Sequence, residues 1–237
     1  MQVFAHRGSS LDHPENTLEA FEAALAEGAT GIETDLRLTR DEVLVLLHDP
    51  DLRRTGADRR RVADLTVSEL ARVRLRGGGG VPLLADLWDL ASKRVRLNLE
   101  LKGRGTGSAL ARFLAGRRWN PEQVLVTSSR SAELAAFRAQ CPAVPAGPVW
   151  SRLGERQRRS LARSGFAAVS LAVEAFSAPA LASCRSHGAE LLLWVVNAPA
   201  RVLDLARAGV DGVFTDCPGP IRNALGLPVP PRGRLVP

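Results

Sequence analysis

The chain has 237 residues, close to the roughly 250 residues of one α/β barrel, and this length favours a single domain. Hydrophobic residues make up 45% of the sequence, and no apolar run reaches the roughly 20 residues of a membrane span, which excludes integral membrane association. The net charge is +7, but aromatic residues are only 5% and tyrosine is absent, so the stacking surfaces of a nucleic-acid binder are not expected. The positive charge instead suits a small anionic substrate.

Strand-like and helical segments alternate along the chain. Nine short segments have the apolar composition of buried strands: 2–7, 31–39, 43–49, 95–102, 123–129, 146–150, 167–173, 190–197 and 211–216. Helical patterns fill most of the intervals, and this order is typical of βαβ units that build a parallel sheet.

The second and third of these segments are expected to pair with each other. Only a few polar residues separate them, whereas a parallel crossover needs a dozen or more, so an antiparallel hairpin is predicted. The remaining eight strands suffice to close a (β/α)₈ TIM barrel. We take Thr39 to face Glu42 across the turn. This register places His48 opposite Glu33, with Asp35 on the same face.

The stretch "NTLEAFEAALAEG" is predicted to form the first outer helix of the barrel. Leu18, Phe21 and Leu25 recur at three- and four-residue spacing, as on the apolar face of a helix. Asn16 is the expected N-cap, and Glu19 would complete a capping box.

The barrel domain is predicted to span residues 1–226. Within it, residues 51–86 lose the strand and helix alternation, and we expect a short insertion after the hairpin, over the carboxyl-terminal mouth of the barrel. Residues 227–237 are rich in proline and arginine and are predicted to be a flexible tail.

The first strand begins at Val3, which leaves no room for a secretory signal, so a cytoplasmic protein is expected. The three cysteines, Cys141, Cys184 and Cys217, are odd in number and lack CxxC spacing, so neither a disulfide framework nor a zinc site is indicated.

Polar residues stand at the carboxyl ends of several predicted strands, where a TIM barrel builds its active site. In "RLNLELK", three leucines alternate with Asn98, Glu100 and Lys102, so the polar set should face the barrel axis. The candidate site residues are His6, Arg7, Glu33, Asp35, His48, Glu100, Lys102 and Trp194.

Glu33, Asp35 and Glu100 form an oxygen-only set that suits one divalent cation, Mg²⁺ or Ca²⁺. The alternative is that these carboxylates are ion-paired to neighbouring basic residues without a metal. With a metal present, His6 and His48 are left to carry protons near neutral pH.

Eight motifs carry a resemblance to a known family. They are "AHRG", "PENT" followed by "AF", "GIETD", "LLHD", "ADLTVSEL", "LELK", "WVVN" and "DGVFTD", in order over about residues 3–218. Together they resemble the glycerophosphodiester phosphodiesterase family. The resemblance implies a (β/α)₈ barrel that hydrolyses glycerophosphodiesters to glycerol 3-phosphate and an alcohol with a divalent metal.

Matched by motif, the resemblance makes His6 and His48 the acid and base, and it makes Arg7 and Lys102 the phosphate-binding residues. It makes Glu33, Asp35 and Glu100 the metal ligands. A cyclic phosphate intermediate is expected, with the two histidines exchanging roles between its formation and its hydrolysis. The segment "GADRRR" and Arg130 depart from the family pattern on the substrate side, which leaves the headgroup open.

Other candidate residues have plainer interpretations. An inward-facing Trp194 suits a glycerol-sized substrate, whereas Asn197 is expected only to cap a helix. His13 and His187 are expected at the surface. Arg152, Arg156, Arg159 and Arg163 follow helical spacing and are expected on one solvated face.

Two alternative functions stay open at this stage. The first is a non-catalytic barrel that binds phosphate esters or polyanions through its arginines. The second is a lyase that stops at the cyclic phosphate. The sequence also leaves the oligomeric state open.

Overall fold

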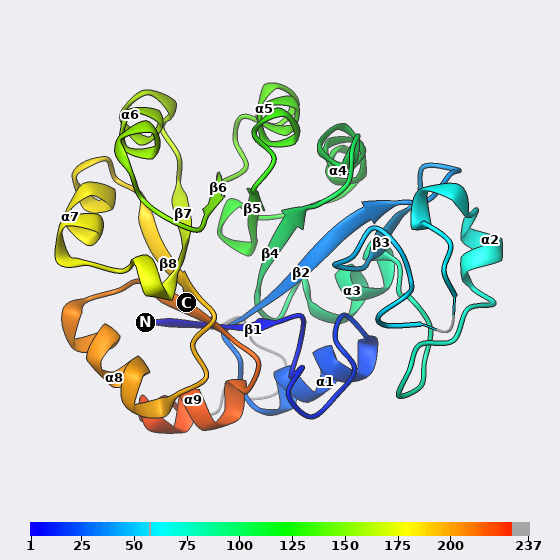
Figure 1. The fold of residues 1–237 in the computed structure, drawn as a ribbon, viewed down its shortest axis with the longest axis horizontal. Coiled ribbons are helices and arrows are strands. Elements are labelled where there is room, and N and C mark those ends of the chain that lie inside the picture. The colour runs from blue at the N-terminus through cyan, green and yellow to red at the C-terminus, as the bar shows by residue number, and fades with distance from the viewer. Residues whose placement is uncertain (57, 229–237) are drawn as a thin grey trace.

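The computed structural model describes residues 1–56 and 58–228, and within them nine strands form one closed sheet (Figure 1). Eight strands are mutually parallel and follow the order β1-β9-β8-β7-β6-β5-β4-β2, and β2 returns to pair with β1. These strands are β1 (Gln2–His6), β2 (Gly31–Leu38), β4 (Arg96–Leu101), β5 (Val124–Ser128), β6 (Ala146–Trp150), β7 (Ala168–Ala172), β8 (Glu190–Trp194) and β9 (Gly212–Thr215). The predicted TIM barrel is confirmed.

Helices form a ring around the barrel (Figure 1). They are α1 (Leu18–Ala26), α3 (Leu84–Ala91), α4 (Thr106–Ala115), α5 (Ser131–Gln140), α6 (Glu155–Ser164), α7 (Ala178–Ser186), α8 (Pro199–Ala208) and α9 (Pro218–Ala224). The main core lies between strands and helices, and it contains Leu97, Leu99 and Leu101 of β4. Their alternation with polar residues therefore turns the polar set inward, as predicted.

The ninth strand, β3 (Leu44–Leu46), pairs antiparallel with β2, so the predicted hairpin is confirmed. The predicted register is wrong by one residue, because Leu38 pairs with Leu44 rather than with Val43. The cause is the turn of the hairpin, in which Glu42 has a positive φ of 60°. Such a backbone conformation is not predicted for a glutamate from the sequence. As a result His48 does not lie opposite Glu33, and the backbone N–H of Leu47 bonds to the carbonyl of Asp35 instead, at 2.9 Å.

The start of α1 also differs from the prediction. Thr17, and not Asn16, is the N-cap, since the Thr17 hydroxyl accepts a hydrogen bond from the Ala20 N–H at 3.2 Å. Phe21 is fully buried as expected, but Leu18 is exposed. The Asn16 side chain is buried and lies in the site described below.

The segment between β3 and α3 contains the short helix α2 (Val67–Leu70), which a capping box of Thr66 and Glu69 begins. It has a small apolar core of its own, which includes Leu52, Val62 and Leu65. In Figure 1 it lies beyond β3, outside the ring of helices. Because α3 begins at Leu84 and packs into the main core, the segment ends before the predicted boundary at residue 86.

The predicted tail, 227–237, lies outside the described residues from 229 onward. Among the residues that the structure describes, no helix combines the length and the apolar character that a membrane span requires.

Candidate active site

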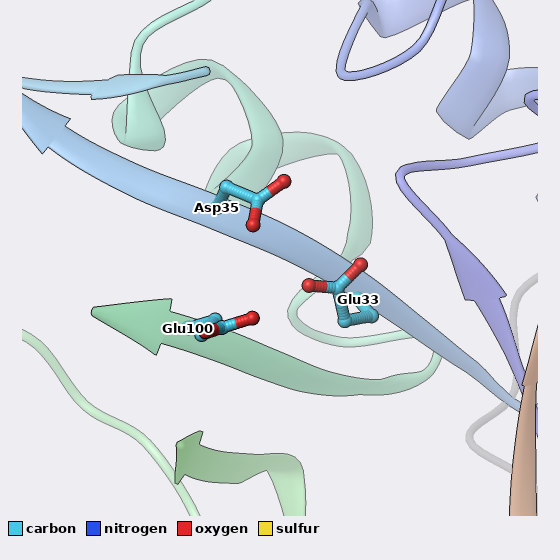
Figure 2. A group of neighbouring side chains, drawn as sticks. All are labelled: Glu33, Asp35 and Glu100. Carbon is cyan, nitrogen blue, oxygen red and sulfur yellow. The ribbon is translucent and has the colours of Figure 1, made fainter. Parts of the chain in front are cut away.

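Three carboxylates meet at the carboxyl ends of β2 and β4. Glu33 and Asp35 lie two residues apart on β2, so both side chains point into the barrel, and Glu100 on β4 pairs in register with Asp35. Their exposed fractions are 4%, 1% and 8%. One carboxylate oxygen of each lies within 4.8 Å of the others (Figure 2). The structure thus brings together the three residues that the sequence proposed as metal ligands.

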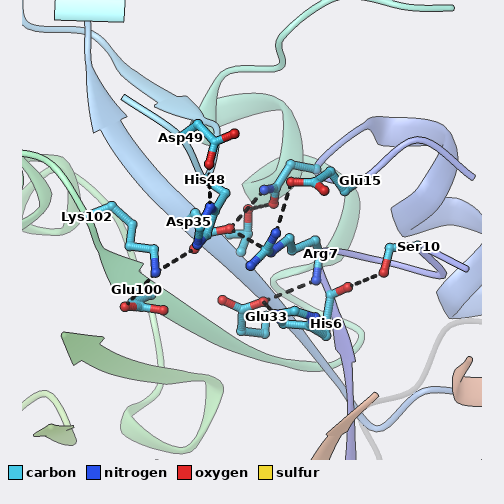
Figure 3. A network of polar contacts seen from close by, with 12 residues as sticks. His6, Arg7, Ser10, Glu15, Glu33, Asp35, His48, Asp49, Glu100 and Lys102 are labelled. Atoms are coloured by element: carbon cyan, nitrogen blue, oxygen red, sulfur yellow. Dashed lines mark hydrogen bonds and ion pairs between the residues drawn. The ribbon is translucent and has the colours of Figure 1, made fainter. Parts of the chain in front are cut away.

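Two cationic side chains lie among these carboxylates (Figure 3). Arg7 Nε is 3.2 Å from Asp35 Oδ2. Lys102 Nζ is 3.0 Å from Glu100 Oε1 and 3.5 Å from Asp35 Oδ1. Glu33 accepts a hydrogen bond from the backbone N–H of Arg7 at 3.1 Å. Ion pairing therefore compensates Asp35 and Glu100 more fully than Glu33.

Because the negative charges of the three carboxylates are compensated to different extents, their pKa values differ. Burial, followed by the charge of Asp35, raises the pKa of Glu33 to about 8. Burial also raises the pKa of Glu100, although Lys102 opposes it. Burial acts in the same direction on Asp35, but Arg7 and Lys102 outweigh it and lower the pKa. Without a further positive charge, burial therefore favours the protonated form of Glu33.

The ligand atoms fit a hard divalent cation. Carboxylate oxygens are the donors that Mg²⁺ and Ca²⁺ prefer, whereas zinc favours nitrogen or sulfur. Asp35 Oδ1 is buried, and within the described residues it has no hydrogen-bond partner. Lys102 Nζ, at 3.5 Å, is its ion-pair partner. A buried carboxylate oxygen that lacks a hydrogen bond and lies beside two further carboxylates is the kind of atom that a cation satisfies. These three residues could hold one such ion.

His6, at the end of β1, is held by an aspartate from the far end of the chain. His6 Nδ1 is 2.7 Å from Asp216 Oδ1, and His6 Nε2 is 4.0 Å from Glu33 Oε2. Burial lowers the pKa of His6, but the hydrogen bond with Asp216 and the charge of Glu33 outweigh it, and the pKa lies above its ordinary value.

Asp216 is itself fixed from two sides. Ser10 Oγ donates to Asp216 Oδ1 at 3.0 Å, and Asn197 Nδ2 donates to Asp216 Oδ2 at 2.7 Å. Burial alone would raise the pKa of Asp216, but the bonds with His6 and Asn197 lower it to about 2. The prediction that Asn197 caps a helix is wrong, because the N-cap of α8 is Ala198.

His48, just after β3, has a matching arrangement. Its Nδ1 lies 2.8 Å from Asp49 Oδ1. Burial lowers the pKa of His48, and the nearby charge of Asp35 does not fully restore it. The two histidines thus have pKa values shifted in opposite directions.

Arg54, from the segment between β3 and α3, connects the aspartate beside His48 to the glutamate beside Arg7. Arg54 Nε donates to Asp49 Oδ2 at 2.6 Å. Its two terminal nitrogens donate to the two carboxylate oxygens of Glu15, at 2.6 and 2.7 Å. Glu15 also accepts from Arg7 Nη1 at 3.0 Å. Arg54 therefore links His48 to Arg7 through two carboxylates, those of Asp49 and Glu15.

A cavity of about 170 Å³ opens among these residues. Its walls include His6, Arg7, Glu33, His48, Glu100, Lys102 and Trp194 from the predicted set. Asp35 lies behind this wall, bonded to Arg7 and to Asn16, whose Nδ2 donates to Asp35 Oδ2 at 3.0 Å. Trp194 is half-buried, and its role in substrate contact stays a prediction.

Sequence reasoning missed several members of this site. Asp216 ends the motif "DGVFTD" and directly follows a strand, and Asp49 ends "LLHD" and directly follows His48. Neither was assigned a role from the sequence. Glu15 and Asn16 belong to "PENT", where Asn16 was expected to be a helix cap. Strand-end position was the signal that could have found Asp216.

The remaining candidates lie away from the cavity. His13 is 3.3 Å from Glu19 Oε1, and His187 is exposed. The arginines of the predicted solvated face, Arg152, Arg156, Arg159 and Arg163, are all exposed. All three cysteines are free thiols.

A family model described as the glycerophosphoryl diester phosphodiesterase family matches residues 6–220. The chain belongs to this family. A glycerophosphodiester phosphodiesterase of Caldanaerobacter subterraneus is 28% identical over 242 residues, and the match covers 93% of this chain and 96% of that protein.

Solved structures agree with this family. An Oleispira antarctica phosphodiesterase, solved in complex with the product sn-glycerol-3-phosphate, matches with a TM-score of 0.87 at 26% identity, covering 95% of this chain and 97% of the other. A glycerophosphodiester phosphodiesterase of Thermotoga maritima matches with a TM-score of 0.80 at 28% identity, covering 92% and 95%. The family, the barrel and the class of enzyme predicted from the sequence are confirmed.

Proposed function

We propose that this phosphodiesterase hydrolyses glycerophosphodiesters to sn-glycerol 3-phosphate and an alcohol, with one divalent cation held by Glu33, Asp35 and Glu100. The observation that carries the proposal is the pair of histidines, each bonded to an aspartate, on the wall of the cavity that contains the carboxylates. The product bound to the Oleispira antarctica relative supports the same substrate class.

The charges of the site suit this reaction. Three carboxylates carry −3, one divalent cation carries +2, and Arg7 with Lys102 carries +2, which leaves +1. A phosphodiester carries −1, so its binding neutralises the site. With a cation held by the carboxylates, Arg7 and Lys102 would be released from part of their present ion pairing and would be available to bind the phosphate oxygens.

When bound, the cation supplies positive charge that stabilises the phosphate and lowers the pKa of the glycerol 2-hydroxyl. His48, whose pKa is lowered, starts neutral and takes the proton of that hydroxyl. The 2-oxygen then bonds to phosphorus, and the bond from phosphorus to the departing alcohol breaks. His6 is the acid in this step and gives a proton to the alcohol oxygen, since its raised pKa favours the protonated imidazole.

Hydrolysis of the resulting cyclic phosphate reverses the roles. His6, now neutral, takes a proton from water, whose oxygen bonds to phosphorus. The bond from phosphorus to the 2-oxygen breaks, and His48 returns a proton to the 2-oxygen as the ring opens. Arg7 and Lys102 stabilise the negative charge that develops on the phosphate in both steps. Asp216 and Asp49 hold the rings through Nδ1, which leaves Nε2 of each ring for proton transfer.

The test is release of glycerol 3-phosphate from several glycerophosphodiesters, measured with Mg²⁺, with Ca²⁺ and with EDTA. We expect product with a cation and loss of product with EDTA. Absence of cation-dependent product from every headgroup would contradict the proposal. Phosphorus NMR of the product distinguishes a hydrolase, which yields the monoester, from a lyase, which yields the cyclic phosphate.

A further inference from the structure

The interior of the barrel changes character from one end to the other. Its lower part is filled by an apolar cluster, as is usual for such barrels, composed of Phe4, Leu125, Ala168, Leu192 and Phe214. Two residues further along β5 and β7, on the same inward face, the chain has Thr127 and Ser170. On β4, Asn98 stands two residues before Glu100. We call Asn98, Thr127 and Ser170 the polar floor.

The polar floor lies directly against the carboxylates. Asn98 pairs in register with Glu33, and Thr127 pairs with Glu100. Ser170, on β7, lines the same cavity as the other two residues. The polar floor therefore shares the wall of this cavity with two of the proposed metal ligands, Glu33 and Glu100.

The polar atoms of the floor are buried and unpaired. Asn98, Thr127 and Ser170 have exposed fractions of 2%, 0% and 2%. Asn98 Oδ1, Thr127 Oγ1 and Ser170 Oγ have no hydrogen-bond partner among the described residues, and neither does Trp194 Nε1 in the same cavity wall. Buried polar atoms are paired in the great majority of cases. Four unpaired atoms around one cavity indicate a polar ligand group that pairs with them.

We propose that the polar floor binds the free primary hydroxyl of the glycerol moiety, the hydroxyl that neither carries phosphorus nor attacks it. This inference rests on the proposed function. The glycerol end of the substrate must reach the carboxylates, because its 2-hydroxyl is the nucleophile. The primary hydroxyl is one carbon away from the nucleophile, and the floor residues Asn98 and Thr127 pair in register with the carboxylate residues.

The chemistry of the floor suits a hydroxyl group. Asn98 Oδ1 only accepts, Trp194 Nε1 only donates, and the two side-chain hydroxyls do both. A hydroxyl group both donates and accepts, so it can pair with atoms of both kinds. An alkyl or quaternary ammonium headgroup can do neither. The cavity, at about 170 Å³, has room for several waters at about 30 Å³ each, and hence for a group of glycerol size.

The test compares two substrates that differ only in this hydroxyl. Glycerophosphocholine carries it, whereas 2-hydroxyethyl phosphocholine keeps the nucleophilic hydroxyl but lacks the hydroxymethyl group. Choline release reports on both. We expect the unaltered enzyme to prefer glycerophosphocholine in kcat/KM. Thr127→Val should lower kcat/KM for glycerophosphocholine by about 10-fold, the equivalent of one hydrogen bond, and leave the other substrate within about twofold.

Thr55→Val is the matched control. The Thr55 hydroxyl is also buried and unpaired among the described residues, but it lies in the segment between β3 and α3 and not in the cavity wall. The same substitution there should leave the ratio of kcat/KM for the two substrates unchanged. Ser170→Ala serves as a second floor variant if Thr127→Val does not fold, as thermal unfolding would show.

The outcomes separate this inference from the proposed function. If the enzyme hydrolyses both substrates with equal kcat/KM, and floor variants do not change the ratio, the floor holds only water and the inference is wrong. If neither substrate is hydrolysed, the proposed function fails. Calorimetric binding of glycerol 3-phosphate and of 2-hydroxyethyl phosphate then tests the floor without turnover: equal affinities overturn the inference, and a preference lost in Thr127→Val supports it.

Discussion

His6 and Asp216, which are 210 residues apart in the sequence, share a hydrogen bond of 2.7 Å between Nδ1 and Oδ1. Closure of the barrel makes this bond possible, because β1 pairs with β9 and brings the first and last strand ends together. Asn197, just after β8, donates to the second oxygen of Asp216. Three consecutive strand ends of the sheet thus orient one imidazole.

Asp216→Asn should lower kcat by about 10- to 100-fold with little change in the folded structure. The amide keeps the size of the carboxylate but removes the charge that raises the pKa of His6, so His6 would be less fully protonated at the start of the reaction. Steady-state kinetics, with circular dichroism as a check of folding, provide the measurement. Unchanged kcat of the Asp216→Asn variant at every pH would contradict the role of Asp216.

The two histidines predict a bell-shaped dependence of activity on pH. His48 must be neutral, so activity should fall with decreasing pH through a pKa below the ordinary histidine value. His6 must be protonated, so activity should fall with increasing pH through a pKa above that value. His6→Ala and His48→Ala should each lower kcat by about 10²- to 10⁴-fold. Near-full activity of either folded variant would reject its catalytic role.

Arg54 is predicted to be a positioning residue that acts through Asp49. Arg54→Ala removes three hydrogen bonds, to Asp49 and Glu15, and should lower kcat by about 10-fold because His48 is then less firmly oriented. The low-pH side of the activity profile should also shift, which a purely structural role would not cause. Arg53→Ala is the matched control, since the neighbouring Arg53 pairs with Asp51 and not with the site.

Sequence patterns predicted the fold in most of its detail. All nine strands were predicted. Buried parallel strands are short apolar runs separated by amphipathic helices, and they can be recognised without information on tertiary contacts. The hairpin register was the exception. It depends on the left-handed backbone of Glu42, and local sequence gives little indication of that conformation in a residue other than glycine, asparagine or aspartate.

The residues of the candidate site likewise fall into those that strand patterns predict and those that depend on the path of a loop. Glu33, Asp35 and Glu100 could be placed together because their positions on adjacent parallel strands follow from strand alternation. Asp216 and Asn16 lie after a strand end or in a loop, where side-chain direction depends on the path of the chain. Asn16 has a positive φ of 57° and donates to Asp35, which no helix-capping rule anticipates.

Lys102 should affect the substrate more than the metal. Lys102→Met removes a positive charge next to Glu100 and Asp35, so the affinity for Mg²⁺ or Ca²⁺ should be unchanged or higher. The proposed contact of Lys102 with the phosphate would be lost, and kcat/KM should fall by about 10²-fold or more. Calorimetry for the cation and kinetics for the substrate separate the two effects. Lys93→Met, at an exposed position, should change neither.

Cation binding and pH should be linked through Glu33. The pKa of Glu33 is about 8 in the folded chain without a metal, against 4.5 for an ordinary glutamate. Between these values the folded state holds a proton that the unfolded state has lost, so stability should fall as pH rises from about 5 to 8 in EDTA. A bound cation favours the ionised carboxylate and should remove this decline, which makes the thermal shift on adding Mg²⁺ or Ca²⁺ grow with pH. Glu33→Gln should weaken the pH dependence measured in EDTA, because Glu100 and His6, whose pKa values are also raised, contribute the rest of the decline. A decline of unchanged size in this variant would assign the linkage to those groups.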